Sequence, residues 1–188
     1  MAGPSDADLA VALGQAADRP VDWYGLGRRP LGRLLIVVVR GQAAFDMISR
    51  GRLPAWGAGL TVPGARFVVI RADGGDPFQV LRHELAHVAL HQAISGRVPL
   101  WFDEGYAVVA AGEWGRLEGL RLNLTVASGE VPGFDALDGA LRGGRATAEA
   151  AYALAGSAVL ALARKNPTQS LGPLLRRLAD REPFGDAV

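Results

Sequence analysis

Residues 81–88 read Leu-Arg-His-Glu-Leu-Ala-His-Val and contain the pattern His-Glu-x-x-His, whose fixed positions are His83, Glu84 and His87. On an α-helix, side chains four positions apart lie one turn apart on the same face, so both histidines can reach one metal ion. Glu84 then lies beside them, where its carboxylate can accept a proton from a water on the metal. The pattern therefore predicts a zinc-binding helix around which the rest of the fold is arranged.

The residues before the pattern also predict a helix. Asp76 is a good N-cap, Pro77 suits the first helical position, and Gln79 stands where a capping box has Glu or Gln. Apolar residues occupy most of the circumference, which predicts a buried helix with the two histidines and Glu84 in the remaining arc. Buried ionisable groups need a partner, and a metal ion supplies one. The alternative is that both histidines are hydrogen-bonded core residues and Glu84 is solvated.

Glu104 is the predicted third ligand, in the stretch Pro-Leu-Trp-Phe-Asp-Glu-Gly-Tyr-Ala at residues 99–107. Ala93 stands where a metzincin has its third histidine, which excludes that class. His91 continues the spacing of four but lies about 12 Å from His83 along a straight helix, so we expect it beside the site or at the surface. The chain has no cysteine, which excludes a thiolate zinc site. Two histidines and one glutamate with an open fourth position form a catalytic arrangement.

The two motifs together resemble those of the gluzincin metallopeptidases, and within them the bacterial peptidase MA-like group with its signature Pro-x-Trp-x-x-Glu-Gly-x-Ala. Weaker similarity extends upstream to residues 54–59 and downstream to residues 151–157. The resemblance implies a compact zincin fold, like the catalytic part of thermolysin, and a zinc ion held by His83, His87 and Glu104.

The resemblance is incomplete at two places and adds one candidate residue. Val108 stands where thermolysin-like enzymes have an aspartate that supports a histidine ligand, so that partner is unassigned. The Gly-Ala-Met-Glu-Asn motif of gluzincin aminopeptidases is missing, which argues against amino-terminal trimming. The resemblance also implies that a tyrosine from a later helix stabilises the oxyanion that forms when water attacks the scissile carbonyl. Tyr152 is the first candidate, before Tyr106 and His91. The alternative role of Tyr152 is helix packing. An extended peptide would add to residues 66–71 at the sheet edge.

The order of elements predicts an α+β fold in a single domain, residues 1–188, with a small sheet first and helices after it. Residues 34–39 form an apolar run typical of a buried strand, and Pro63-Gly64 predicts a type II turn between two hairpin strands. We expect Trp56 and Trp101 to be core residues, residues 128–145 to be a mobile connection, and Asp186 to cap a further helix. The other expected elements are strands at 59–62 and 66–70 and helices at 6–17, 42–49, 102–111, 146–165 and 167–180.

Composition narrows the class of protein. The chain has 188 residues, 49% hydrophobic and 21% charged, as in a globular domain. Its 20 basic and 19 acidic residues are scattered and give a net charge of +1, which gives no reason to expect a nucleic acid partner. No targeting segment is evident, and the run at 34–39 is too short to span a bilayer, so a soluble chain without a membrane span is expected. Cytoplasmic and extracytoplasmic locations and the oligomeric state stay open.

The leading functional hypothesis is a zinc metallopeptidase, an endopeptidase that acts on peptide or protein substrates with Glu84 as the general base. The first alternative is a zinc hydrolase of non-peptide amides, since the same activated water would serve. The second is a non-catalytic domain that keeps the zincin scaffold for binding. An intact Glu84 argues against this second alternative, because a binding domain has no chemical need for a base beside two ligands.

Overall fold

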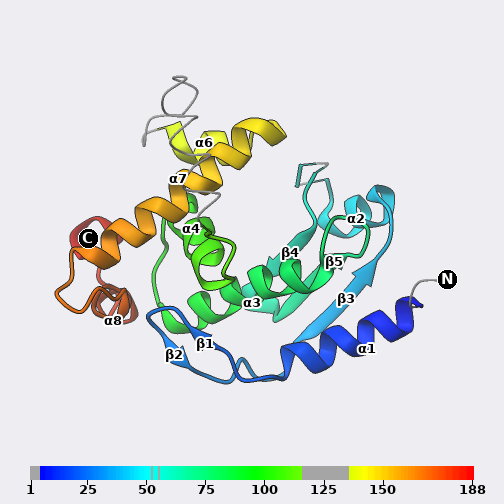
Figure 1. The fold of residues 1–188 in the computed structure, drawn as a ribbon, viewed down its shortest axis with the longest axis horizontal. Coiled ribbons are helices and arrows are strands. Elements are labelled where there is room, and N and C mark those ends of the chain that lie inside the picture. Colours follow the sequence, from blue (N-terminus) through cyan, green and yellow to red (C-terminus); the bar gives the residue numbers. More distant parts are fainter. Residues whose placement is uncertain (1–4, 52, 55, 116–135) are drawn as a thin grey trace.

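The computed structural model describes residues 5–51, 53–54, 56–115 and 136–188, and it combines helices with two small sheets (Figure 1). This mixed architecture agrees with the expected α+β class. The helices are α1 (Asp6–Ala17), α2 (Gln42–Ser49), α3 (Pro77–Ala93), α4 (Leu100–Ala110), α6 (Leu137–Leu141), α7 (Arg145–Arg164), α8 (Gly172–Ala179) and α9 (Phe184–Ala187). The strands are β1 (Asp22–Trp23), β2 (Gly27–Arg28), β3 (Leu35–Val39), β4 (Gly59–Val62) and β5 (Phe67–Arg71), with a 3₁₀ turn at Pro63–Ala65.

The larger sheet has the strand order β3-β5-β4, with β5 parallel to β3 and antiparallel to β4. Val68, Val69 and Ile70 of the central strand are fully buried, as the continuous apolar sequence of a central strand requires. The prediction that residues 34–39 form a buried strand is wrong in this respect, because β3 is an edge strand whose Leu35 is 60% exposed. A second, two-stranded ribbon of β1 and β2 was not predicted.

The predicted hairpin of β4 and β5 is confirmed, but its turn differs from the prediction. The register pairs Val62 with Phe67, so four residues connect the strands where a type II turn leaves two. The connection is the 3₁₀ turn followed by Arg66, which adopts a left-handed conformation with φ of 52°. The Arg66 guanidinium donates hydrogen bonds to the carbonyl oxygens of Leu31 and Arg33, and these contacts hold the turn against the segment before β3.

Helix α3 lies at the centre of the molecule and contacts α1, α4, β4 and β5 (Figure 1). Its predicted start is confirmed, since the Asp76 carboxylate accepts a hydrogen bond from the Phe78 N–H at 2.9 Å. Gln79 does not complete a capping box; its side-chain amide donates to the Ala111 carbonyl oxygen and to Glu113. Contact with both the sheet and α4 buries most of the helix, including Glu84 and His87.

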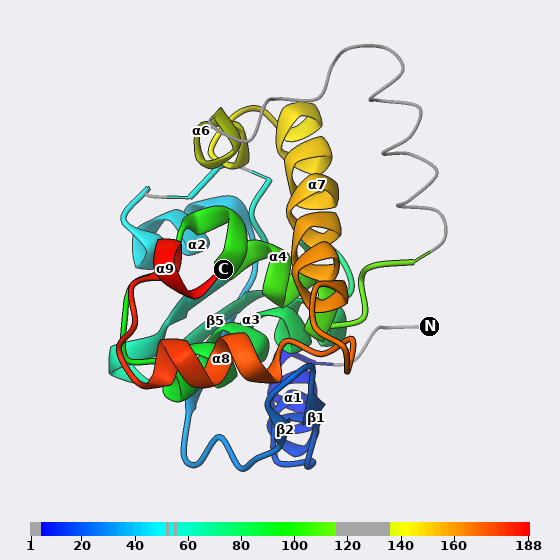
Figure 2. The ribbon, with the colours of Figure 1, turned by 90° about the vertical axis from the view of Figure 1, so that its left-hand side faces the viewer.

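The helical half of the chain is built on close contact between α4 and α7, which lie side by side in both views (Figures 1 and 2). Gly105 permits this approach, since an added Cβ would overlap the Ala155 backbone. Helix α7 is the one helix among the described residues that is long and apolar enough to cross a bilayer, and core helices of soluble proteins meet the same criterion. This finding is weak evidence for a membrane span.

Three expectations for the C-terminal part change. The region 128–145 lies partly outside the described residues, and its described end contains α6, whose Leu137 and Leu141 are buried one turn apart. Helix α8 starts at Gly172 and not near residue 167, because the Asn166 side chain accepts the Thr168 N–H and forms a turn. Asp186 lies inside the short helix α9. Trp101 packs against Phe102 and Phe184 at the main core, as expected.

Candidate metal centre

Helices α3 and α4 bring His83, His87 and Glu104 together, with one ligand atom from each residue within 4.8 Å of the others. The Oε2 atom of Glu104 lies 3.3 Å from His83 Nε2 and 3.6 Å from His87 Nε2. Two ligand atoms at about 2.0 to 2.1 Å from a tetrahedral zinc ion lie roughly 3.4 Å apart. The two separations from Glu104 therefore match those expected around a tetrahedral ion of this size.

A second group that could hold a metal ion consists of His87, His91 and Asp103. In this group the Asp103 carboxylate lies 2.7 Å from His87 Nδ1 and 2.7 Å from His91 Nε2. These are hydrogen-bond lengths, shorter than the separation of two ligands on one zinc ion. These distances are typical of hydrogen bonds from both histidines to Asp103, and the separations in the first group are closer to those of metal ligands.

Asp103 and Glu113 supply the histidine partners that sequence reasoning left unassigned. Asp103 Oδ1 contacts Nδ1 of His87, and both Glu113 carboxylate oxygens lie 3.2 Å from Nδ1 of His83. Each histidine thus turns Nε2 toward Glu104 and Nδ1 toward another carboxylate, which fixes the orientation of both rings. Val108, where such a partner was sought, faces the contact with α7 near Gly156. The position of Asp103 directly before Glu104 is a sequence feature that could have pointed to its role. No sequence feature pointed to Glu113.

The carboxylates keep a positive charge on the histidines when no cation is bound. Burial opposes protonation, but the hydrogen bonds that His83 donates to Glu104 and Glu113 raise its pKa to about 10. Burial likewise opposes protonation of His87, and Glu104 and Asp103 raise its pKa well above the ordinary value. Burial raises the pKa of Glu104 and Asp103, but the contacts with the histidines lower it by more. The pKa of Glu104 therefore lies well below its ordinary range, and that of Asp103 is about 2. The carboxylates therefore favour positive charge at this cluster.

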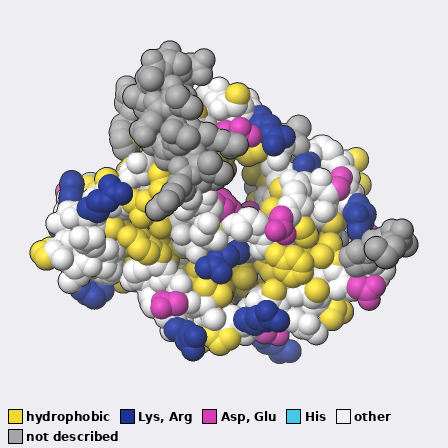
Figure 3. Space-filling model, viewed as in Figure 1, with side chains coloured by type: hydrophobic (Ala, Val, Ile, Leu, Met, Phe, Trp, Pro, Cys, Tyr) yellow, Lys and Arg dark blue, Asp and Glu magenta, His cyan; other side chains and the backbone are white. Residues whose placement is uncertain are grey.

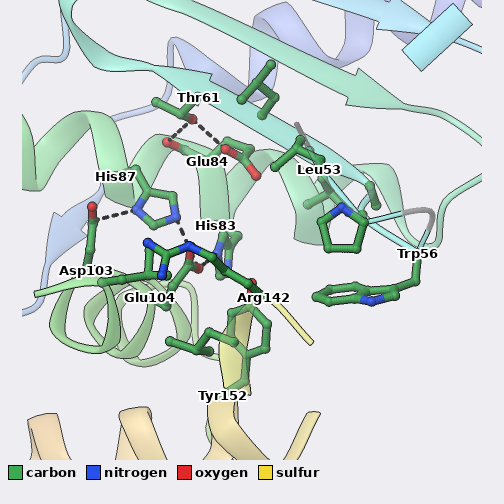
Figure 4. Close-up of a pocket in the computed structure, with 18 of the residues that line it drawn as sticks. Leu53, Trp56, Thr61, His83, Glu84, His87, Asp103, Glu104, Arg142 and Tyr152 are labelled. Carbon is green, nitrogen blue, oxygen red and sulfur yellow. Dashed lines mark hydrogen bonds and ion pairs between the residues drawn. The ribbon is translucent and has the colours of Figure 1, made fainter. Parts of the chain in front are cut away.

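Glu84 is buried beside this cluster and does not belong to either metal-binding group. Burial raises the pKa of its carboxyl group. Its Oε2 atom lies 2.5 Å from the Thr61 hydroxyl of β4, and Figure 4 shows the carboxylate between Thr61 and the side chain of His83. A carboxylate with a raised pKa and a fixed orientation is suited to accept and release a proton.

Of the three tyrosines, only Tyr152 is placed at the site. Its ring centroid lies 6.3 Å from that of His83, and burial together with the nearby carboxylates, including a hydrogen bond with Glu104, raises the pKa of its hydroxyl. Tyr106, the weaker candidate, is fully buried in the core away from the cavity, so it has no access to a substrate. Trp56 lines the cavity edge-on to Tyr152 at 6.1 Å, which corrects its expected place in the core.

Apart from Tyr106, Val108 and Gly156, the residues described above line one cavity of about 750 Å³ between the sheet side and the α6–α7 side of the molecule. Figure 3 shows acidic side chains in the hollow at the centre of this face and basic side chains scattered around it. Strand β4 forms one wall, with Gly59, Leu60 and Thr61. The expectation that residues 66–71 lie at the sheet edge is wrong, because β5 is the central strand and β4 is the edge strand on this side.

No protein-family model, no curated protein and no solved structure matches this chain.

Proposed function

We propose that the protein is a zinc-dependent peptidase of the gluzincin type that cleaves within peptide chains. The observation that carries the proposal is the placement of Glu84 in the cavity that also holds the ligand atoms of His83, His87 and Glu104. Two histidines and one glutamate leave a fourth position for water, which distinguishes a catalytic zinc site from a closed structural one. The order of sheet, His-Glu-x-x-His helix and glutamate helix supports the assignment of a zincin fold.

The chemistry of the site follows from its residues. A zinc ion held by His83, His87 and Glu104 would polarise the scissile carbonyl and lower the pKa of water at the open position. Glu84 would accept a proton from that water as the water oxygen bonds to the carbonyl carbon, and it would return the proton to the amine nitrogen as the C–N bond breaks. The Tyr152 hydroxyl donates a hydrogen bond to the carbonyl oxygen, where negative charge develops. Thr61 fixes the orientation of Glu84.

Strand β4 supports peptides as the substrate class. It is an edge strand, so its outer backbone groups can pair with an extended chain, and it lines the cavity beside Glu84. An added peptide strand would place successive carbonyl groups along the wall of the site. Hydrolysis of non-peptide amides uses none of these backbone groups, so β4 favours the peptide substrate.

The test compares the zinc-loaded protein with its Glu84→Gln variant on a degenerate peptide library, with new termini identified by mass spectrometry. The parent is expected to generate new internal cleavage products. The variant is expected to keep one zinc ion per chain and its Tm, and to lose on the order of a hundredfold to ten-thousandfold in rate, since only the proton acceptor is removed.

Glu149→Gln is the matched control, because Glu149 lies exposed on α7 in an ion pair with Arg145 and outside the cavity. This control is expected to cleave the library as the parent does. A Glu84→Gln protein with parental activity would assign activation of the water to another group, and a zinc-loaded parent that cleaves no peptide would end the peptidase proposal.

A further inference from the structure

Arg142 is the only lysine or arginine among the described residues that line the cavity. It is the C-cap residue of α6 and follows Leu141, a buried residue that lines the same cavity. Figure 4 shows its side chain extending from α6 over the cavity, toward the side where Asp103 and His87 lie. A single positive charge is thus presented to whatever occupies the cavity.

The side chain of Arg142 donates one hydrogen bond to another described residue. Its Nη1 group donates to the Asp138 carbonyl oxygen at 3.1 Å, which ties the side chain to its own helix. In the described part of the chain it forms no ion pair with a carboxylate. A guanidinium has five N–H donors in a planar fork, so most of them have no acceptor among the described residues.

The acidic groups of the cavity are already engaged by other partners. Glu84 binds Thr61, Asp103 binds two histidines, and Glu104 and Glu113 both contact His83. None of them forms an ion pair with Arg142 in the structure. Within the described part of the chain, no carboxylate of the cavity thus neutralises the guanidinium by direct contact.

The charge of the cavity selects against an acidic substrate everywhere except at Arg142. Its described lining contains four carboxylates, Glu84, Asp103, Glu104 and Glu113, against one guanidinium, and a zinc ion would offset only two of the four. A substrate carboxylate is repelled by this surplus unless a cation meets it. A guanidinium binds a carboxylate through two parallel hydrogen bonds, which fixes its position as well as its charge.

We propose that Arg142 binds a carboxylate of the substrate and thereby selects peptides that carry an acidic group close to the cleaved bond. The proposal rests on the peptidase function proposed above and adds a specificity-determining residue to it. The carboxylate belongs either to an acidic side chain or to the C-terminus of the peptide. The first source is compatible with internal cleavage, and the second would make the enzyme a carboxypeptidase.

Binding to the zinc-loaded Glu84→Gln protein tests the proposal apart from catalysis. The probes are acetylated, alanine-rich pentapeptides with one phenylalanine in three forms: a neutral C-terminal amide, the same amide with one glutamate at each position in turn, and the free acid. Dissociation constants are measured by calorimetry. We expect one acidic form to bind roughly tenfold more tightly than the neutral amide, the gain that a partly exposed charge-assisted pair provides. The form that gains affinity identifies the source of the carboxylate.

Adding Arg142→Gln to the zinc-loaded Glu84→Gln protein is expected to abolish the preference for the acidic peptide. Binding of the neutral amide should stay unchanged. Arg142→Lys should retain part of the preference, since it keeps the charge and loses the fork. Arg145→Gln is the matched control, because this neighbouring arginine is exposed and does not line the cavity. It should preserve the full preference.

Equal binding of all three peptide forms, or no binding of any acidic form at millimolar concentration, would overturn the proposal. A preference for an acidic peptide that persists in Arg142→Gln would also overturn the proposal. If that remaining preference is lost when zinc is removed, the metal binds the carboxylate. If the preference depends on Arg142 but the zinc-loaded parent protein cleaves no peptide, the carboxylate-binding site is supported and the peptidase function is contradicted. The two failures are thus distinguishable.

Discussion

The hydroxyl oxygen of Thr61 lies 2.5 Å from Oε2 of Glu84, so the edge strand β4 is bonded directly to the acidic residue of the His-Glu-x-x-His helix. The same hydroxyl lies 3.0 Å from the Glu84 carbonyl oxygen. Gly59, on the same face of the strand two residues earlier, completes the contact, because an added Cβ there would overlap the Glu84 carboxylate. Strand β4 thus both orients Glu84 and leaves room for it.

Replacing Thr61 by valine should lower kcat roughly tenfold without loss of zinc. Valine keeps the branched shape but removes the hydroxyl that orients the buried carboxylate, which costs about 1 to 3 kcal/mol when a charged group loses such a partner. Steady-state kinetics on a peptide cleaved by the parent and zinc analysis measure the effect. Thr61→Ser, which restores the hydroxyl, should recover most of the rate; equal kcat for the valine and serine variants would exclude an orienting role.

The chain should bind one zinc ion through Glu104 and the two histidines of α3, and not through the second group. Glu104→Gln and His87→Ala should both lose stoichiometric zinc in elemental analysis, because each removes a ligand of the first group. His91→Gln should retain it, because His91 contacts Asp103 and is not a member of the first group. If His91→Gln lost the ion and Glu104→Gln kept it, the metal would lie at His87, His91 and Asp103.

Much of this site was predictable from local sequence, because its core uses helical spacing. His83, Glu84 and His87 are placed by the period of α3, whose start is determined by Asp76 and Pro77. Glu104 was inferred from a motif on the next helix, and the structure brings it to within 3.6 Å of both histidines. These predictions depended on short stretches of chain and a single helix–helix contact.

The remaining contacts depend on how distant elements meet, which a single sequence does not specify. Glu113 reaches His83 only because the chain turns back after α4, 30 positions further on. Thr61 reaches Glu84 because β4, and not β5, is the edge strand, and two apolar strands of similar composition give no sign of their order. Arg142 is carried to the cavity by a five-residue helix in a Gly-rich region, where helix propensity is low.

Zinc binding at pH 7 should release about two protons per ion. The pKa of His83 is raised to about 10 and that of His87 well above 6.5, so both are protonated in the metal-free protein and must lose a proton to bind zinc. Calorimetry in two buffers of different ionisation enthalpy counts the protons. Affinity should therefore fall as the pH is lowered below 7; binding without proton release would mean that the histidines are already neutral.

The same pKa shift predicts how the metal-free fold responds to pH. Because the folded-state pKa of His83 exceeds its unfolded value of 6.5, its contacts stabilise the fold fully below pH 6.5 and are lost as the pH rises toward 10. The Tm of the metal-free protein should thus decrease between pH 6.5 and 10, more than the Tm of His83→Gln does. Parallel pH profiles for the two proteins would contradict the raised pKa.

Asp103→Asn should weaken zinc binding by about tenfold to a hundredfold, the usual effect of removing the carboxylate that orients a ligating histidine. Asparagine keeps the shape of the side chain but has no charge and only one oxygen, so it cannot accept hydrogen bonds from His87 and His91 through two carboxylate oxygens. Competition with a chelator measures the affinity. Asp180→Asn, at the exposed end of α8, makes the same change far from the cavity and should leave the affinity unchanged; a similar loss in both variants would indicate a nonspecific charge effect.

Tyr152→Phe should lower kcat by roughly tenfold to a thousandfold with little change in KM or Tm. The phenol faces the cavity beside His83 and Glu104, and its interaction with the carbonyl oxygen would strengthen only as negative charge develops there. Phenylalanine keeps the ring contacts with Trp56 and His83, so a loss of rate would report the hydroxyl alone. Tyr106→Phe is the matched control, because that hydroxyl is buried in the core without a hydrogen-bond partner among the described residues, and its removal should leave kcat unchanged. Equal activity of the two variants would assign Tyr152 to packing and leave the oxyanion to another donor in the cavity.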